Sequence, residues 1–456
     1  MKTSYWQTRA FALSVAAGVF VLGFLAVYRP TLVLLVPASF LAGLALFAIP
    51  RDRVLPVSLV LALAIVVFLT PGQFGPGLIS LLFPPVGAFS LCLFGLRRSL
   101  KAVRYPPGFS LLCAVFSVAM VATVIYPSTQ IYYAMTALVG LTVLVAAASV
   151  DTRGVRVVRL GVVAIGVMLS LLGFLERFVL GEALVGNYAV SLGNNTIVGG
   201  VRAQATLGAP VVLGFVIMLS LIVLVSSGLF GTFARVVVVF VLLVGIMTSG
   251  TASALVVAVI MIPGAIFLRL GLRSKLSAIV TAAFGWLFIF GFSVLPQGIL
   301  DGVFSKLEGQ NAVHRSNSWK AIPNLFSDQS VDHILIGNGW GSARALYRSG
   351  VLIEDGFYAI DNQFAWSISV FGVIGAAFLV AFLVVVFVRG DAVVRSVLVG
   401  SVIMGFSFDF FAWVSSLAVI LCVVGLGSMN RVDDVNGDGA SDKLEAIDES
   451  QNAVKA

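Results

Sequence analysis

The stretch TLGAPVVLGFVIMLSLIVLVS, residues 206–226, carries no charge and is long enough to cross a bilayer as one helix. A transmembrane helix needs about 20 apolar residues to cross roughly 30 Å of hydrocarbon. Segments of this kind recur along nearly the whole chain, which has 456 residues, is 60% hydrophobic and 11% charged, and has a mean hydropathy of +1.09. These values exclude the soluble classes and predict an all-α polytopic membrane protein.

The apolar segments predict about 12–14 transmembrane helices. The first is followed at once by others, so we interpret it as a spanning helix and not as a cleaved signal peptide. The stretch 396–427 is too long for one span and is interrupted by FSFDFFAW at 406–413, so it is interpreted as two helices. The other predicted spans are 10–28, 31–49, 54–70, 76–96, 108–126, 131–149, 160–178, 206–226, 233–249, 252–270, 276–296 and 364–388.

Short basic clusters separate the spans and predict the topology. With a cytoplasmic N-terminus, alternation of the helices puts all these clusters on the cytoplasmic side, as the positive-inside rule requires. The net charge of +8 is therefore a topology signal and does not indicate a nucleic-acid partner. The clusters lie at 51–53, 97–104, 151–159, Arg235, 269–275 and 389–395.

This topology divides the chain into four parts. A helical bundle, 1–296, is followed by a long external loop, 297–362, and by C-terminal transmembrane helices, 363–428. The tail 429–456 has few apolar residues, so we expect it to be cytoplasmic and disordered. The external loop is the expected place of the functional site, because loops of this length inside a compact architecture are usually functional.

The external loop contains HRSNSWKAI, residues 314–322, and both histidines of the chain. We predict a short helix here, with Asn311 as its cap and Pro323 at its end. That helix would place Arg315, Trp319 and Ile322 on one face.

The segment IGNGWGSARALYRSG, residues 336–350, predicts a strand-like approach, a glycine-rich turn and a helix from near Ser342 to Gly350. Arg344 and Arg348, four residues apart, would face the same way on that helix. A glycine-rich turn before a helix suits anionic oxygens, so the turn is either a phosphate cradle or an ordinary structural turn.

Five other charged positions are candidates. Asp361, with Asn362, stands where the last long helix begins, and an aspartate there is either a cap or a functional group. Arg202 precedes a span and is either a ligand or a snorkelling anchor. Glu176 and Arg177 lie near the outer end of their span, where we expect them to reach water, and Asp409 lies in the break between the last two helices.

These residues together resemble the O-antigen ligase and O-antigen polymerase superfamily of bacterial envelope glycosyltransferases. The resemblance lies in the order of its motifs: Arg202 before a span, TSGTAS at 248–253, Arg315 with Trp319 and Lys320, then GNGWG, and Asp361 and Asn362 followed by Gly372 and Gly375. In the ligase branch the corresponding last motif begins with histidine. Aspartate followed by asparagine here is more similar to the polymerase branch.

The resemblance implies a GT-C-like architecture in the bacterial cytoplasmic (inner) membrane, with both termini cytoplasmic and the active-site loop extracytoplasmic. The implied substrate is a polyprenyl pyrophosphate-linked oligosaccharide presented from the membrane lipid. A chain-length regulator or other polysaccharide-assembly membrane proteins are the implied partners. Neither a metal nor another cofactor is expected, because nothing in the loop resembles an acidic metal-binding pair and Cys92, Cys113 and Cys422 each sit in an apolar run.

The resemblance also implies roles for the candidate residues. Arginines would hold the pyrophosphate and stabilise the charge that develops as the sugar–phosphate bond breaks. Asp361 would act as the base, with His314 as its rival, and Trp319 would stack on a sugar. The expected pyrophosphate ligands are Arg202, Arg315 and Arg344 or Arg348, and the further substrate-binding candidates are Lys320, Gly337, Gly339, Asn362 and Asp409.

Three alternatives stay open at the level of sequence. The first is a ligase that transfers glycan to a lipid or protein acceptor. The second is a flippase or exporter of lipid-linked oligosaccharide, although transporters place their polar residues near the bilayer midplane and often show internal repeats. The third is a scaffolding role, which predicts no convergent arginines.

Overall fold

The computed structural model describes residues 49–69, 78–99, 102–125, 131–182, 196–197, 200–269, 316–353 and 360–427. The chain divides into two compact units, Met1–Val54 and Leu55–Ala456, and the following description concerns the second. Several predicted features lie outside the described residues: the spans at 10–28 and 276–296, nearly all of 31–49, the tail, and the loop residues up to Arg315, with His314 among them.

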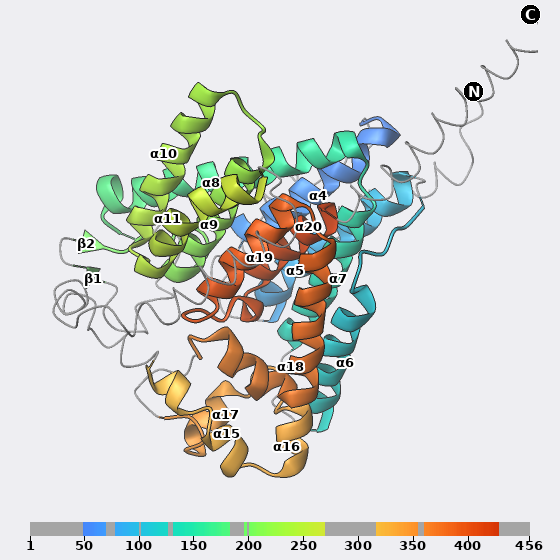
Figure 1. Ribbon diagram of the computed structural model, residues 1–456, viewed down its shortest axis with the longest axis vertical. Coiled ribbons are helices and arrows are strands. Elements are labelled where there is room, and N and C mark those ends of the chain that lie inside the picture. Colours follow the sequence, from blue (N-terminus) through green and yellow to red (C-terminus); the bar gives the residue numbers. More distant parts are fainter. Residues whose placement is uncertain are drawn as a thin grey trace, which may run out of the picture. The chain divides into compact units, whose positions relative to one another are not determined.

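Every described segment that was predicted to span the membrane is a helix (Figure 1). Helices α8, with the π-helical turn that continues it, α9, α10 and α18 are long and apolar enough to cross a bilayer, at Thr152–Leu180, Pro210–Ser227, Thr232–Ser249 and Gln363–Arg389. The protein is therefore an all-helical membrane protein in its described part, with only a two-residue hairpin of β1 (Thr196–Ile197) and β2 (Gly200–Val201) besides. The other apolar helices are α4 (Arg51–Phe68), α5 (Leu78–Ser99), α6 (Phe109–Ile125), α7 (Ile131–Ala148), α11 (Ala252–Arg269), α19 (Ala392–Met404) and α20 (Val414–Leu426).

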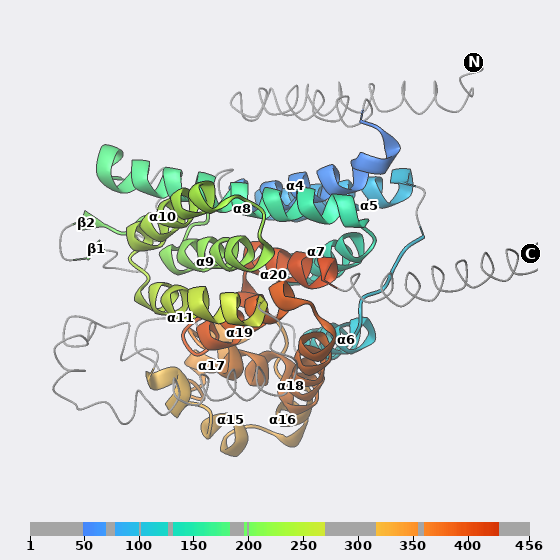
Figure 2. The same ribbon diagram turned by 45° about the horizontal axis from the view of Figure 1, so that its top comes forward.

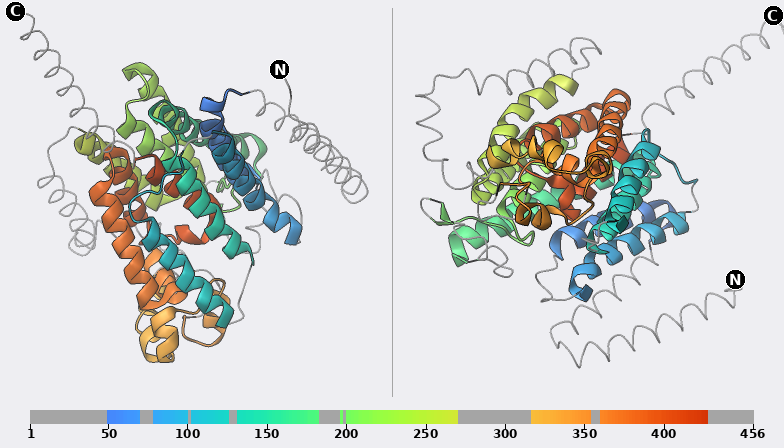
Figure 3. Two further views of the ribbon diagram at one scale, coloured as in Figure 1. Left: turned by 90° about the vertical axis from the view of Figure 1, so that its right-hand side faces the viewer. Right: turned by 90° about the horizontal axis from the view of Figure 1, so that it is seen from below.

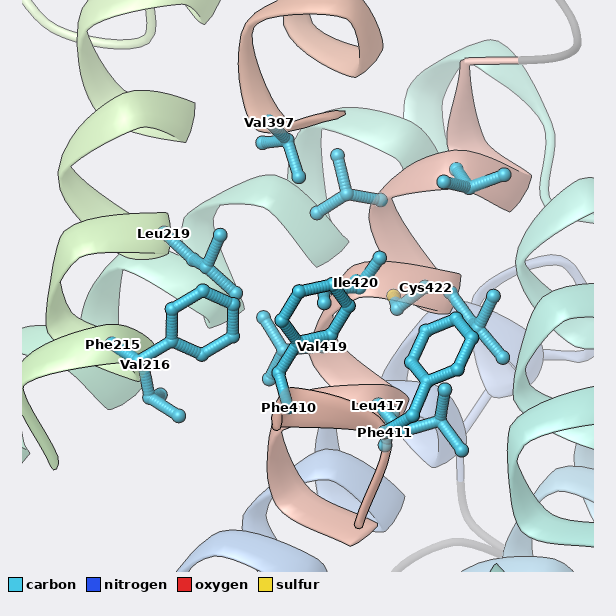
Figure 4. Packing of buried hydrophobic residues seen from close by; sticks show 14 of the residues in the cluster. Phe215, Val216, Leu219, Val397, Phe410, Phe411, Leu417, Val419, Ile420 and Cys422 are labelled. Carbon is cyan, nitrogen blue, oxygen red and sulfur yellow. The ribbon is translucent and has the colours of Figure 1, made fainter. Parts of the chain in front are cut away.

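Helix α9 forms the centre of the core. Nearly all its side chains are buried, because α8, α10, α11 and α19 pack around it (Figure 2). Its Phe215 stacks on Phe410 with the ring centroids 5.5 Å apart and meets Phe408 edge-on at 5.3 Å (Figure 4). Small residues allow the helices to approach closely: a Cβ built on Gly166 of α8 would lie 2.4 Å from the Cβ of Ser220.

Hydrogen bonds show which helix termini lie together. The Thr206 hydroxyl donates to Val67 O at the end of α4, the Thr251 hydroxyl donates to Pro210 O at the start of α9, and Gln363 N donates to Gly405 O after α19. We call this end of the bundle, where α9, α11 and α18 begin, the site end.

The opposite end carries most of the described arginines. Arg104 N donates there to the Ser149 hydroxyl, and Arg159 pairs with Asp391 at 2.5 Å. By the positive-inside rule this is the end expected on the cytoplasmic side, so the observed clustering agrees with the alternation predicted from the sequence. The arginines at this end are Arg97, Arg98, Arg104, Arg153, Arg156, Arg159, Arg235, Arg389 and Arg395.

The described part of the external loop packs on a kink in α18. Gly372 interrupts α18 with φ +63°, and α16 (Val331–Ile336) packs against α18 and α6 beside it. The strand-like approach predicted for this stretch is wrong, because the residues before GNGWG form α16, which packs on other helices instead of pairing in a sheet. The helix predicted after the turn is confirmed as α17 (Ala343–Arg348).

The polar segment at 316–320 is also helical, as predicted, but its end differs from the prediction. The helix gives way to a turn at 321–323, and Pro323 then leads into α15 (Asn324–Ser327). The first helix therefore ends before Pro323, and this proline leads into a further helical turn, because proline is well tolerated at the start of a helix.

Candidate functional site

Two carboxyl groups are brought together at the site end. Asp409 lies between α19 and α20, and Asp361 directly precedes the cap of α18. Three hydrogen bonds fasten these segments: Gln363 N donates to Gly405 O at 2.8 Å, Phe411 N donates to the Gln363 side chain at 3.0 Å, and the Asn362 side chain donates to Phe406 O at 3.4 Å. Residues far apart in sequence, both candidates from the sequence, thus form one carboxyl pair.

Asp409 is the buried member of the pair. It is 7% exposed, and burial raises the pKa of its carboxyl well above the ordinary value. The charge of Asp361 raises that pKa further, while a hydrogen bond with the Trp413 side chain opposes the shift. Because like charges at close range cannot both ionise cheaply, the pair favours the protonated form of Asp409, the more buried of the two carboxyl groups.

An exposed aromatic surface adjoins the carboxyl pair. Trp319 is 40% exposed and stacks on Phe406, with the ring centroids 5.7 Å apart and the planes 25° apart. It also lies 6.3 Å from Phe364, and Phe364 and Phe406 are 4.8 Å apart. Phe406 precedes Asp409 by three residues and Phe364 follows Asp361 by three, so Trp319 lies over the segments that carry both carboxyls. An indole face partly open to solvent suits the apolar face of a sugar ring.

A second polar group lies at the end of α8, where the helix becomes the π-helix Leu175–Leu180. Glu176 is 1% exposed, and its carboxylate accepts the backbone N–H of Gln204 at 2.8 Å and of Ala205 at 2.6 Å. The expectation that Glu176 reaches water is therefore wrong. The π-helical turn adds a residue to the helix, and this side chain faces the 202–205 segment instead of solvent.

Arg202 and Arg177 hold the same turn, the TSGTAS segment between α10 and α11. Arg202 Nε donates to Ser249 O at 3.2 Å, and its Nη2 lies 3.4 Å from the Thr251 hydroxyl. Arg177 Nη1 donates to Met247 O at 3.0 Å and to Thr248 O at 3.3 Å. The position of Arg202 is thus set by the protein, which a simple snorkelling anchor does not require.

Helix α9 connects the two groups. The Thr251 hydroxyl that Arg202 contacts also donates to Pro210 O, at the first residue of α9. Phe215, five residues further along, packs against Phe408 and Phe410 on either side of Asp409. Five residues of helix rise about 7.5 Å, so the arginine group and the carboxyl pair lie about one and a half turns apart along α9.

The GNGWG turn is a packing element. Gly337 N donates to His333 O, Asn338 N to Ser369 O, Gly339 N to Val370 O and Trp340 N to the Thr123 hydroxyl. The amides of residues 337–340 are therefore bound to protein acceptors, and the structural alternative accounts for Gly337 and Gly339. Both glycines have left-handed φ, and a Cβ on Gly337 would lie 2.4 Å from Val370 O.

Asn362 caps helix α18. It is fully buried, and its side-chain oxygen accepts the N–H groups of Phe364 and Ala365 at 2.9 Å each, while its amide donates to Phe406 O. The cap that an aspartate often supplies is supplied here by the next residue, which leaves Asp361 outside the cap. The remaining candidates in the described loop, Arg344, Arg348 and Lys320, have exposed side chains.

Sequence analysis missed two residues of the carboxyl pair's surroundings. Gln363 joins the two segments, and Trp413 hydrogen-bonds Asp409. The sequence does contain a signal for Gln363. It stands beside Asn362 at the start of an apolar helix, where burial of a glutamine side chain without a hydrogen-bond partner is costly. Among the described residues, no group of three or more His, Cys, Asp or Glu side chains could hold a metal ion.

Comparison with known proteins adds no further constraint. Neither a protein-family model nor a curated protein matches the chain. The functional argument therefore rests on the residues themselves.

Proposed function

We propose that this protein is a membrane glycosyltransferase that acts on polyprenyl pyrophosphate-linked oligosaccharide units and joins them into a polymer. The observation that carries the proposal is the carboxyl pair Asp361–Asp409 beside the partly exposed indole of Trp319. Arg202, held at the same end of α9, adds a fixed cation. A base, a sugar platform and a cation are the groups that transfer from a diphosphate-linked sugar needs.

The proposed reaction is a displacement at the anomeric carbon. A hydroxyl of the acceptor sugar attacks that carbon, and the bond from carbon to the diphosphate oxygen breaks. The diphosphate leaves with the electron pair, and arginines, Arg202 among those described, stabilise its charge. The hydroxyl proton passes to the carboxylate of Asp361. Asp409, whose pKa is raised by burial, lies beside it as the buried member of the pair.

Two features of the described structure favour this proposal over a transporter. The polar side chains discussed above gather at one end of the bundle, and α9 at the centre of the core contains no charged residue. A transporter of charged lipid-linked glycan places polar groups near the midplane. We place the carboxyl pair on the extracytoplasmic side of the bacterial cytoplasmic membrane, in a GT-C-like arrangement, by the positive-inside argument.

The test is a reconstitution that follows the length of lipid-linked glycan. Wild type would build a ladder of repeats, whereas Asp361→Asn and Trp319→Ala would leave single lipid-linked units. Asp328→Asn, an exposed carboxylate in the same loop, is the matched control and would build the ladder. Transfer to a different acceptor without lengthening would show a ligase. Translocation of the lipid-linked unit with no new glycosidic bond would refute the proposal.

A further inference from the structure

Helix α16 of the external loop carries an apolar face that is exposed in the described part of the structure. Val331 is 69% exposed and Leu335 43% exposed, and they lie four residues apart, on one face of the helix. The opposite side of α16 packs on α18 and α6. Soluble surfaces rarely expose such residues together with further large apolar neighbours.

The exposed face of α16 continues an exposed stripe on α18. Val373, Val380, Val384 and Val388 are 40%, 58%, 56% and 56% exposed, and their spacing puts them on one face of the helix. A charge-free stripe of valines on a helix long enough to span a bilayer is a lipid-facing surface. Leu335 lies at the Val373 end of this stripe. Its carbonyl oxygen would be 2.4 Å from a Cβ built on Gly372, the residue before Val373.

The height of α16 along α18 matches the bilayer boundary. From Val373 to Arg389, α18 has 17 residues after the kink, which rise about 25 Å. If Arg389 marks one edge of a hydrocarbon core of roughly 30 Å, the kink and α16 lie just inside the other edge. Helix α6, which is also 17 residues long, gives the same position for α16 relative to the bilayer. The Thr123 hydroxyl near the end of α6 accepts the N–H of Trp340, in the turn that follows α16, so α16 lies at the end of α6 as well. Figures 1 and 3 show α16 at the end of the adjacent helices α6 and α18.

We propose that α16 is an interfacial helix whose Val331 and Leu335 insert among the lipids of the membrane leaflet at the site end. The bilayer is thus a binding partner of the external loop as well as of the spanning helices. The GNGWG turn, which follows α16 directly and is bound to the α18 kink, fixes this helix to the bundle. This proposal does not depend on the glycosyltransferase function.

The inserted helix would set the level of the loop relative to the membrane surface. Trp319 and the helix 316–320 belong to the same external segment as α16, and α18 begins beside the carboxyl pair. A loop tethered at the interface keeps these groups near the headgroups, where a lipid-linked substrate would present its polar part.

The test places a fluorescent label on single cysteines in vesicles of phosphatidylethanolamine and phosphatidylglycerol. Cys92, Cys113 and Cys422 are first replaced by alanine, and cysteine is then introduced by Val331→Cys, Leu335→Cys or, as an exposed control, Ser349→Cys. Labels at 331 and 335 would emit at shorter wavelength and be quenched by brominated lipid but hardly by aqueous iodide. The label at 349 would show the reverse.

Two results would overturn the proposal. Strong iodide quenching at 331 and 335, with no effect of brominated lipid, would show that the face is open to water. Shielding from both quenchers would show that protein, such as a second copy of the chain, covers it. The introduced cysteines stand at exposed positions, where loss of folding is not expected. Because Cys92 and Cys422 are buried, circular dichroism of the cysteine-free protein and of each labelled protein checks that the fold is kept.

Discussion

Glu176→Ala should destabilise the site end through two orphaned amides. In the wild type the Glu176 carboxylate accepts the N–H groups of Gln204 and Ala205, and all three residues are buried. Each buried donor left without an acceptor costs about 1–3 kcal/mol, so the substitution should cost about 2–6 kcal/mol in the free energy of unfolding. Ala205 is held at φ +47°, where a residue with a Cβ costs about 1–2 kcal/mol, and the hydrogen bond from its N–H to Glu176 helps to hold this strained conformation.

Two further variants separate the hydrogen bonds from other effects. Glu176→Gln keeps the shape and one acceptor oxygen and removes a buried charge, so it should lose much less stability than Glu176→Ala. Ala205→Gly in the Glu176→Ala background should recover about 1 kcal/mol, because glycine adopts positive φ without strain. The free energy of unfolding is measured by denaturant titration in detergent micelles, with helicity as the signal.

The same variants test whether this group positions Arg202. Because Ala203 N donates to Thr248 O and Arg202 binds the following residues of that turn, release of the 204–205 amides should displace Arg202. Glu176→Ala would then weaken binding of a polyprenyl diphosphate, and Ala205→Gly would partly restore it. The prediction is refuted if the free energies of unfolding of Glu176→Ala and of wild type differ by less than about 0.5 kcal/mol, the usual range for surface substitutions.

Three other substitutions give measurable predictions. Asp409→Asn should flatten the pH dependence of stability. Because the folded protein holds the Asp409 pKa above its ordinary value, the wild type should lose stability as pH rises from about 4 towards that raised pKa. Thermal melts at a series of pH values show whether the variant lacks this loss. Gly337→Ala should prevent stable folding because its Cβ would overlap the backbone of α18. Gly350→Ala is the control: Gly350 has φ +79° and no atom within 4 Å of an added Cβ, so this substitution should cost only about 1–2 kcal/mol. Equal yields of the two folded variants in size-exclusion chromatography would contradict this prediction. Arg159→Met should cost about 1.5–3 kcal/mol by leaving the half-buried Asp391 without its arginine, and adding Asp391→Asn should recover part of that loss in the same denaturant titration.

The helices could be predicted because the bilayer makes a local demand. A segment that crosses hydrocarbon must satisfy its own backbone and be apolar over about 20 residues, and both requirements are visible in a window of sequence. Most of the described spans from 54 onward, with the break at 406–413, were therefore predicted within a few residues of their observed bounds. The exception is the span predicted at 160–178: α8 begins at Thr152, because the basic stretch 151–159, interpreted as a loop, forms the first turns of the helix. The error at α16 arose because a six-residue apolar stretch does not distinguish a strand from a short helix.

The candidate site could be predicted only in part. Sequence singled out Asp361, Asp409, Trp319 and Arg202 individually, because polar and aromatic residues at a membrane edge are uncommon enough to notice. Their grouping could not be predicted, since it depends on contacts between segments far apart in the chain. Glu176 shows the limit: near the end of a span it was expected to reach water, and a π-helical turn buried it instead.

The sequence by itself determined that the described part of the chain is helical and suited to a membrane, and where its apolar helices lie, because these properties follow from the composition of each segment. Only the tertiary structure decided what the polar residues do. It joined Asp361 to Asp409, made Asn362 the cap, used the GNGWG amides for packing and turned Glu176 inward. The physical reason is that a buried polar group must find a partner, and its partner is supplied by whichever segment packs against it.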